Sequence, residues 1–474
     1  MTAMTQSIVI QVGQCGNQIG CRFWDLCLHE HAFYNEKGIY DDAVSSFFRN
    51  TDHACDIPTK IGTNQIKNLK ARAILVDMEE GVINELLDGD LGEIFDNKQL
   101  ITDVSGSGNN WATGNKEYGT RYKEKILDQV RKAAELCDCL QCFFVLHSMG
   151  GGTGSGLGTA ILSLLADEFP DVYRFVIPVY PSGDDDVITS PYNSVLATNE
   201  LTEHADCVLP INNQSLINMC AKIQQALPQK KFSKSAGGSV SSGSKRIGSD
   251  KPFDQMNNIV ANVMLNMTSS ARFEGSLNVD LNEIAMNLVP YPKLHYLVSS
   301  ISPLYVSKDV GLYARRLDQA FNDLFSKDHQ LMVSDPQRSL YLACALMVRG
   351  KNVQVSDVRH NISRLSSNLC FVNWNHEGWK TGLCNIPPVG QQYSLLALAN
   401  NTCIRHAFTD LRTRFSKLYS RKAHLHHYEK VDGFDRNLFS ESLSSLDNIV
   451  AQYEELEHKS GSGTPQCLPR IKVL

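Results

Sequence analysis

A glycine-rich stretch in the first third of the chain constrains its fold more than any other feature. Five of the seven residues from Gly150 to Gly156 are glycine, and Ser148 and Thr153 add hydroxyl groups. The apolar run before this stretch is typical of a buried strand, and the apolar residues after it recur at the helical spacing i, i+3, i+4. Open backbone N–H groups between a strand and a helix N-terminus attract anions. The stretch therefore predicts a phosphate-binding loop.

This loop differs from two widespread phosphate-binding motifs. No lysine follows the glycines, which excludes the Walker loop. The glycine spacing gives only a broken dinucleotide fingerprint, and the acidic residue expected about 20 positions further on is missing, which argues against a dinucleotide-dependent enzyme. A purely structural turn is the remaining alternative, although so many glycines would lose more backbone entropy than a turn requires.

Strand, loop and helix patterns alternate from the N-terminus to about residue 220. Small-residue loops and helical patterns follow a series of apolar runs. The runs that predict strands are 8–10, 73–76, 143–146, 175–180 and 207–211. This alternation predicts a mostly parallel, doubly wound sheet in which all strand C-termini open on one crevice.

Three more loops are expected at the same crevice. Two are the small-residue segments 13–18 and 106–111, and the third contains Asp77 and Glu79 directly after a predicted strand. Two carboxylates beside phosphates suit a hydrated Mg²⁺ ion, although Asp77 and Glu79 could equally cap the following helix. Together the four loops predict a nucleoside triphosphate site.

The second half of the chain has a different pattern. Residues 228–251 contain seven serines, four glycines and six basic residues, which predicts a flexible basic insertion. An apolar stripe from Met256 to Met267 predicts a long core helix. Further strands are expected at 294–299, 340–349, 371–374 and 393–399, and helices from about 402. The expected units are 1–251, 252–401, 402–458 and a loose tail at 459–474.

Composition and charge narrow the expected partners. The net charge of −6 provides no positive field for a polyanion, so nucleic acid is not expected as a partner. The longest apolar run, 340–348, is far shorter than the roughly 20 residues of a membrane-spanning helix, so no membrane partner is expected. Fourteen scattered cysteines without a leader segment predict free thiols in the cytoplasm.

Two clusters superficially resemble metal sites. Cys142 and His147 flank an apolar run that would carry them to opposite faces of a strand, which separates them from Cys137 and Cys139 as joint zinc ligands. A second cluster contains His424, His426 and His427, of which only the outer two have helical spacing. We expect neither cluster to bind a metal.

Four motifs in one order resemble those of the tubulin superfamily. They are QVGQCGNQIG (11–20), SGSGNNWA (105–112), GGGTGSG (150–156) and LNVDLNE (277–283). The resemblance extends from about residue 7 to about 457. A different start, the basic insertion and the missing acidic tail separate the chain from alpha and beta tubulins and favour the branch that serves centrioles and basal bodies. The resemblance implies an α/β fold with a doubly wound parallel-sheet GTPase domain, an α+β intermediate domain and a C-terminal helical hairpin.

The resemblance also implies a GTP or GDP site with Mg²⁺. Asn213 and Asn257 would bind the guanine, and Phe253 replaces a tyrosine whose ring stacks on the base. Asp77 and Glu79 would hold Mg²⁺ through water. The remaining implied nucleotide contacts are Gly13, Gln14, Cys15, Gln18, Asn109, Ser148, Gly150, Gly151, Gly152, Thr153, Gly154, Ser155 and Gly156. Ser190 stands where alpha and beta tubulins have glutamate, so their ribose contact is not carried over.

Asp280 and Glu283 belong to the last motif. In tubulins this loop covers the nucleotide of the next subunit, so the resemblance implies that Glu283, with Asp280 beside it, orients the attacking water in a neighbouring molecule. Taken alone, the two residues would be the acidic first turn of a helix. The chain by itself is therefore expected to be at most a slow GTPase, completed by a neighbouring subunit.

The function implied by the resemblance is that of a GTP-binding structural subunit of the microtubule cytoskeleton. It would act in centriole or basal-body microtubule assembly and in centrosome organisation. Its expected partners are other tubulin-family subunits and centriolar or centrosomal proteins. A GTP-binding adaptor or capping subunit that binds other tubulins without polymerising is the alternative, and the sequence does not separate the two.

Overall fold

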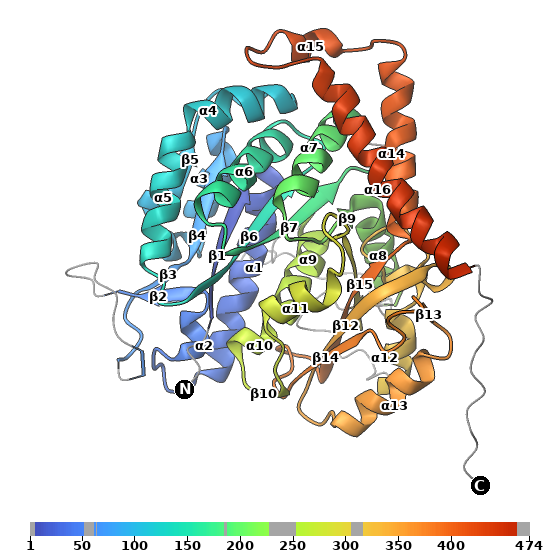
Figure 1. The fold of residues 1–474 in the computed structure, drawn as a ribbon. Coiled ribbons are helices and arrows are strands. Elements are labelled where there is room, and N and C mark those ends of the chain that lie inside the picture. The colour runs from blue at the N-terminus through green and yellow to red at the C-terminus, as the bar shows by residue number, and fades with distance from the viewer. Residues whose placement is uncertain are drawn as a thin grey trace, which may run out of the picture.

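The computed structural model of the protein describes residues 5–51, 61–62, 64–183, 187–226, 253–304 and 316–461. The basic insertion expected at 228–251 lies outside these residues, as does most of the tail expected at 459–474. Figure 1 shows an N-terminal sheet in blue and green, a second sheet in orange, and the C-terminal helices in red along one side.

A seven-stranded sheet forms the N-terminal part of the structure. Six strands follow the order β5-β4-β1-β6-β7-β8, β9 pairs with β7, and the pairings are parallel. The strands are β1 (Gln6–Val12), β4 (Ala73–Asp77), β5 (Leu100–Thr102), β6 (Leu140–Ser148), β7 (Tyr173–Tyr180), β8 (Cys207–Val208) and β9 (Ile211–Asn212). The expected parallel, doubly wound sheet is confirmed.

Helices cover both faces of this sheet. They are α1 (Gly13–Tyr34), α2 (Asp42–Ser45), α3 (Glu80–Leu87), α4 (Gly119–Arg121), α5 (Lys123–Glu135), α6 (Gly158–Glu168), α7 (Ser190–His204), α8 (Asn213–Ala226) and α9 (Asp254–Met267), and β2 (Phe48–Asn50) pairs with β3 (Leu69–Ala71) beside them. Because successive strand residues point to opposite faces, Val9 belongs to a buried cluster that includes residues of α1, α3, α8 and α9, whereas Ile8 and Ile10 belong to a second cluster that includes residues of α5, α6 and α7.

A second, mixed sheet follows α9 in the chain. Its order is β10-β14-β12-β15-β11, and β13 pairs with β12. Its strands are β10 (Gly275–Leu277), β11 (Leu297–Ser302), β12 (Leu340–Gly350), β13 (Cys370–Phe371), β14 (Trp379–Cys384) and β15 (Tyr393–Asn401), and its helices are α10 (Ser269–Arg272), α11 (Leu281–Leu288), α12 (Leu317–Leu324) and α13 (Val355–Leu365). Both parallel and antiparallel pairings occur, so this sheet is mixed, unlike the parallel N-terminal sheet.

The predicted core helix connects the two sheets. Val260, Val263 and Met264 of α9 are buried in a cluster that includes strand residues of both sheets, such as Phe144 and Leu398. The apolar stripe that predicted this helix is therefore its buried face.

Two long helices close the chain. They are α14 (Ile404–Tyr419) and α16 (Asn437–Gly461), joined by the short helix α15 (Leu425–Glu429). α14 and α16 pack against each other and against α7, which confirms the expected helical hairpin (Figure 1). None of the helices among the described residues is long and apolar enough to span a lipid bilayer.

Three strand predictions need correction. The run 207–211 was expected to form one strand but forms β8 and β9, because Pro210 has no N–H group to continue the ladder. The strand expected at 371–374 is only the two-residue β13, and the strand expected at 294–299 begins three residues later, at Leu297.

Candidate functional site

One cavity opens where the strands of the parallel sheet end. It has a volume of about 490 Å³, a size suited to a small-molecule ligand. The loops after β1, β4, β5, β6 and β7 form its wall together with the first residues of α8 and the segment that begins α9. The expected residues that line it are Gly13, Gln14, Cys15, Gln18, Asp77, Glu79, Asn109, Ser148, Gly150, Gly151, Gly152, Thr153, Gly154, Asn213, Phe253 and Asn257.

The glycine-rich loop lies close to two neighbouring segments. A Cβ atom added at Gly152 would lie 2.5 Å from the backbone nitrogen of Asn110, and one added at Gly154 would lie 2.6 Å from Ser148 Oγ. A hydrogen bond of 2.8 Å between the hydroxyls of Ser107 and Thr153 joins the same loops. Close packing therefore requires glycine at positions 152 and 154, and both residues also line the cavity.

Ser155 and Gly156 do not line the cavity. Ser155 is buried and donates a hydrogen bond to the Gly151 carbonyl oxygen. A side chain at Gly156 would collide with the Trp111 carbonyl oxygen. Both residues lie behind the loop and fix its shape.

Asn193 holds two of the loops together. Its amide nitrogen donates to the carbonyl oxygens of Asn109 at 2.9 Å and Gly150 at 2.8 Å, and its oxygen accepts from the Trp111 N–H at 3.0 Å. The side chain is fully buried, with 0% exposure. Sequence reasoning missed this role, because Asn193 is one of several polar residues in its helix, such as Ser194 and Thr198, and nothing in the sequence distinguishes it from them.

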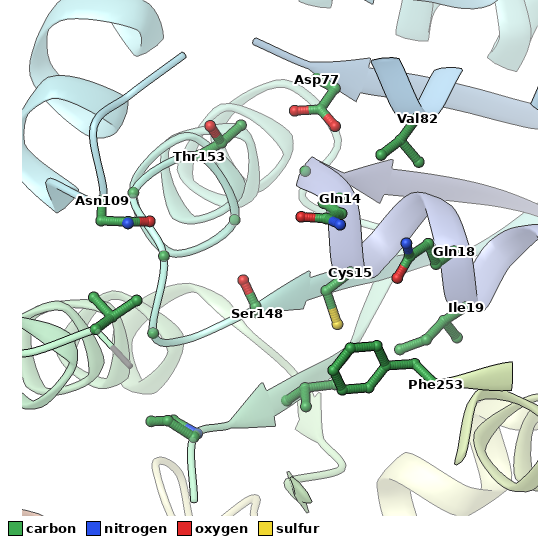
Figure 2. Close-up of a pocket in the computed structure, with 18 of the residues that line it drawn as sticks. Gln14, Cys15, Gln18, Ile19, Asp77, Val82, Asn109, Ser148, Thr153 and Phe253 are labelled. Carbon is green, nitrogen blue, oxygen red and sulfur yellow. The ribbon is translucent and has the colours of Figure 1, made fainter. Parts of the chain in front are cut away.

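Asp77 places a carboxylate at one end of the cavity (Figure 2). The residue is only 3% exposed, and its Oδ2 atom has no hydrogen-bond partner among the described residues. Burial raises the pKa of Asp77 to about 6. A buried carboxylate oxygen without a partner fits a hydrated cation, because Mg²⁺ is commonly held by one or two carboxylates together with phosphate oxygens and water.

The described residues contain no cluster of three or more His, Cys, Asp or Glu side chains able to hold a metal ion. The two clusters that superficially resemble metal sites lie at residues 137–147 and 424–427. The rings of His426 and His427 are tilted by 40° with centroids 3.9 Å apart, and the ring of His424 lies 6.0 Å from that of His427 in a nearly parallel orientation. Burial raises the pKa of Cys142 and lowers that of His147 to about 4, so both side chains are neutral at pH 7.

The opposite end of the cavity is aromatic and apolar. Phe253 is 53% exposed, and Figure 2 shows its ring near Cys15 and Ile19. Burial raises the pKa of Cys15 to about 12, so its thiol is neutral at pH 7. Asn213 and Asn257 add amide groups that can both donate and accept hydrogen bonds. This end of the cavity can receive a flat heteroaromatic ring. Sequence reasoning missed its apolar lining, which includes Ile19, Val179, Leu216 and Met256.

Asp280 and Glu283 lie near the start of β6, whereas the cavity lies where this strand ends. Asp280 caps α11 by accepting from the Leu281 N–H at 2.8 Å, and it also accepts from the Gln141 side chain. Gln141 is the second residue of β6, whereas the cavity lies at Ser148, seven residues further along the strand, or roughly 23 Å at 3.3 Å per residue. Glu283 forms an ion pair with Lys380 at 2.7 Å. The structure therefore does not bring Asp280 and Glu283 to the cavity of their own chain.

Comparisons with known proteins match both parts of the chain to one family. The family model described as Tubulin/FtsZ family, GTPase domain matches residues 6–221, and that of the Tubulin C-terminal domain matches residues 292–413. The chain is 62% identical over 480 residues to the tubulin epsilon chain of Mus musculus, which covers 99% of this chain and 100% of that relative. Identity to the Homo sapiens tubulin epsilon chain is 61% over 475 residues, with the same coverage. Identity to the tubulin beta-1 chain of Chondrus crispus is 34% over 467 residues, covering 97% of this chain and 96% of that relative.

The chain belongs to the tubulin family. It is a GTP-binding subunit of the microtubule cytoskeleton, and interaction with other tubulins is a property of this family. The expected resemblance to a branch other than alpha and beta tubulin is confirmed by the identity to tubulin epsilon chains.

Proposed function

We propose that the cavity is the guanine nucleotide site of this subunit. One observation carries the proposal: five loops from distant parts of the chain converge on a single cavity whose two ends differ in chemistry. One end has open glycine backbone and a buried carboxylate oxygen without a partner. The other end has the aromatic ring of Phe253, and the amide groups of Asn213 and Asn257 also line the cavity.

We assign the phosphates to the end formed by residues 13–18, 109 and 148–154, and the guanine to Phe253, Asn213 and Asn257. Asp77 and Glu79 are assigned to Mg²⁺ through water, and the ion would neutralise phosphate charge. Gly106 supports this assignment. A Cβ atom at Gly106 would lie 2.7 Å from Glu79 Oε1, so the loop after β5 closely approaches the loop that carries Glu79. Ser155 and Gly156 are assigned to holding the loop in shape.

Hydrolysis is proposed to need a second molecule. Glu283 is too far from the cavity of its own chain to orient water there, so it can act only on the nucleotide of a neighbour. Asp280 is assigned to fixing the start of the helix that carries Glu283.

We propose that the protein acts in the assembly of centriolar or basal-body microtubules and in centrosome organisation, in the cytoplasm. The identity of 61–62% to tubulin epsilon chains over nearly the full length supports this assignment. Centriolar or centrosomal proteins are its proposed additional partners. The division into units 1–251, 252–401, 402–458 and 459–474 is proposed with it, and the two separate sheets support the first boundary.

The nucleotide site can be tested by binding a fluorescent GTP analogue. A Cβ atom at Gly151 would meet nothing closer than 3.6 Å, so Gly151→Val should fold while obstructing the cavity. Gly151→Val and Asn213→Ala are both expected to weaken binding. Asn218→Ala is the matched control, because Asn218 lies on the same helix but is exposed and outside the cavity. Unchanged affinity in both site variants would refute the assignment.

Sedimentation with GTP, in the presence and absence of alpha/beta tubulin, distinguishes a polymerising subunit from a capping one. A polymerising subunit should enter large assemblies in proportion to its concentration. A capping subunit should instead shorten tubulin polymers at low molar ratios.

A further inference from the structure

We propose that Tyr428 is a positioning residue for the backbone that binds the phosphates, and that it acts through Asn193. This inference rests on the proposed nucleotide site. It links that site to the connection between the last two helices, which contributes no residue to the cavity.

Tyr428 is linked to Asn193, and through Asn193 to the phosphate loops, by one short hydrogen bond. Its hydroxyl donates to Asn193 Oδ1 at 2.6 Å, and the side chain is only 1% exposed. The ring is fixed by aromatic neighbours, with centroid distances of 5.8 Å to Tyr192, 5.9 Å to Phe434 and 5.3 Å to Phe439. The hydroxyl is therefore held in place independently of Asn193.

The bond from Tyr428 fixes the orientation of the Asn193 amide. Asn193 Oδ1 accepts from two donors, the Tyr428 hydroxyl and the Trp111 N–H, which turns the amide nitrogen toward the carbonyl oxygens of Asn109 and Gly150. Asn109 and Gly150 both line the cavity. Loss of the tyrosine hydroxyl leaves the amide oxygen with a single donor, so the two loops are less firmly joined.

Two further bonds connect the same parts of the molecule. Asn110 donates from its side chain to the His427 carbonyl oxygen at 2.9 Å. The Tyr192 hydroxyl donates to the Ala423 carbonyl oxygen at 2.9 Å. The segment around α15 is thus bonded both to the loop that carries Asn109 and to the start of α7. Because coupling between two sites is reciprocal, a nucleotide that orders the phosphate loops must also stabilise this segment.

Tyr428→Phe tests the proposal, because it removes only the hydroxyl. We expect its affinity for a fluorescent GTP analogue to fall roughly threefold or more, the effect of one lost hydrogen bond. Affinity for guanosine, measured by competition, should stay unchanged because guanosine has no phosphates. Tyr40→Phe is the matched control: Tyr40 is buried, donates to the Phe48 carbonyl oxygen at 2.9 Å and lies outside the cavity lining.

Hydrogen exchange provides a second readout. GTP should slow amide exchange in Leu425–Glu429 of the wild-type protein, and this protection should shrink in Asn193→Ala and in Tyr428→Phe but not in Tyr40→Phe. Equal losses of GTP and guanosine affinity in Tyr428→Phe, or wild-type affinity for both, would overturn the positioning role. A wild-type protein that binds no GTP analogue would instead refute the proposed nucleotide site itself.

Discussion

Arg272 and Arg349 are fully buried side chains that share one carboxylate, that of Glu30. Glu30 lies 2.7 Å from Arg272 and 3.1 Å from Arg349, so the interior carries more positive than negative charge at this point. Burial alone would raise the pKa of Glu30, but the charges of Arg349 and Arg272 outweigh this effect and lower its pKa below the ordinary value. Glu30 is therefore ionised in the folded protein, and its charge is needed there.

Glu30→Gln should destabilise the protein strongly, because it leaves two buried guanidinium groups without a counter-charge. Breaking such a pair costs about 3–5 kcal/mol. Glu117→Gln is the control, since Glu117 forms an exposed ion pair with Arg121 at 3.5 Å and pairs of this kind contribute about 1 kcal/mol or less. Thermal unfolding should show a much lower midpoint for Glu30→Gln than for the control. Equal midpoints would contradict this expectation.

The structure also predicts how the loss of stability in Glu30→Gln, relative to the wild type, depends on pH. The folded pKa of Glu30 lies below its ordinary value of 4.5, so its contribution is fully present above that value and is lost as the pH falls through the folded pKa. The difference in midpoint between wild type and Glu30→Gln should therefore stay constant from pH 5.5 to pH 7.5. A difference that disappears near pH 6 would show that the pKa is raised instead.

Among the residues of the candidate site, the sequence predicted those with a chemical signature. The glycines of the phosphate loop and the carboxylates after β4 are recognisable by type and spacing alone. Asn193 and Leu216 are not, because a buried asparagine or leucine in a helix looks like ordinary core until the neighbouring loops are in place. The sequence also did not show which side of the loop Ser155 faces.

At the scale of elements, burial explains which strands could be predicted. β6, β12 and β15 are almost entirely buried, so they appear as continuous apolar runs. β14 has the sequence WKTGLC, which is neither continuously apolar nor regularly alternating, and it was missed. β14 is held in the sheet by its pairing with β12, and this contact between distant parts of the chain exists only in the folded state.

The position of Glu283 at the start of α11 leads to a prediction about hydrolysis. Glu283→Ala should leave GTP binding by its own chain unchanged and should slow hydrolysis in assemblies, where we propose that the residue acts on the nucleotide of another subunit. The matched control is Glu454→Ala, because Glu454 is about equally exposed and also forms an ion pair, with Arg405 at 3.3 Å. Phosphate release would be measured for monodisperse protein and for assemblies with alpha/beta tubulin. Equal turnover in both states would contradict the need for a neighbour.

At the scale of the whole molecule, the negative charge is not concentrated at the C-terminus. Residues 459–474 contain no acidic residue, although the net charge of the chain is −6. The segment between α15 and α16 has no net charge, since Lys430 and Arg436 offset Asp432 and Asp435. Exposed charges act over only about 8 Å at physiological salt, so distant acidic residues cannot replace a local acidic tail.

Basic microtubule-binding proteins should therefore bind this subunit weakly. Oligolysine provides a simple probe. We expect little binding to the wild-type chain, and stronger, salt-sensitive binding after an acidic extension is added to the C-terminus. An uncharged extension of the same length is the control. Strong binding of oligolysine to the wild-type chain at physiological salt would show that another surface supplies the negative field.

The helix that carries Glu283 contacts the start of β6, whereas the cavity lies at its end. This separation limits the symmetry of any assembly in which one copy completes the site of another. In a two-fold pair both molecules use the same patch, so such a pair could complete both sites only if that one patch contained Glu283 as well as the cavity. A head-to-tail contact needs no such patch, and unless it closes into a ring it leaves one uncovered cavity and one unused Glu283 at opposite ends. Such a stack has a direction, and its two terminal copies are chemically different surfaces for growth.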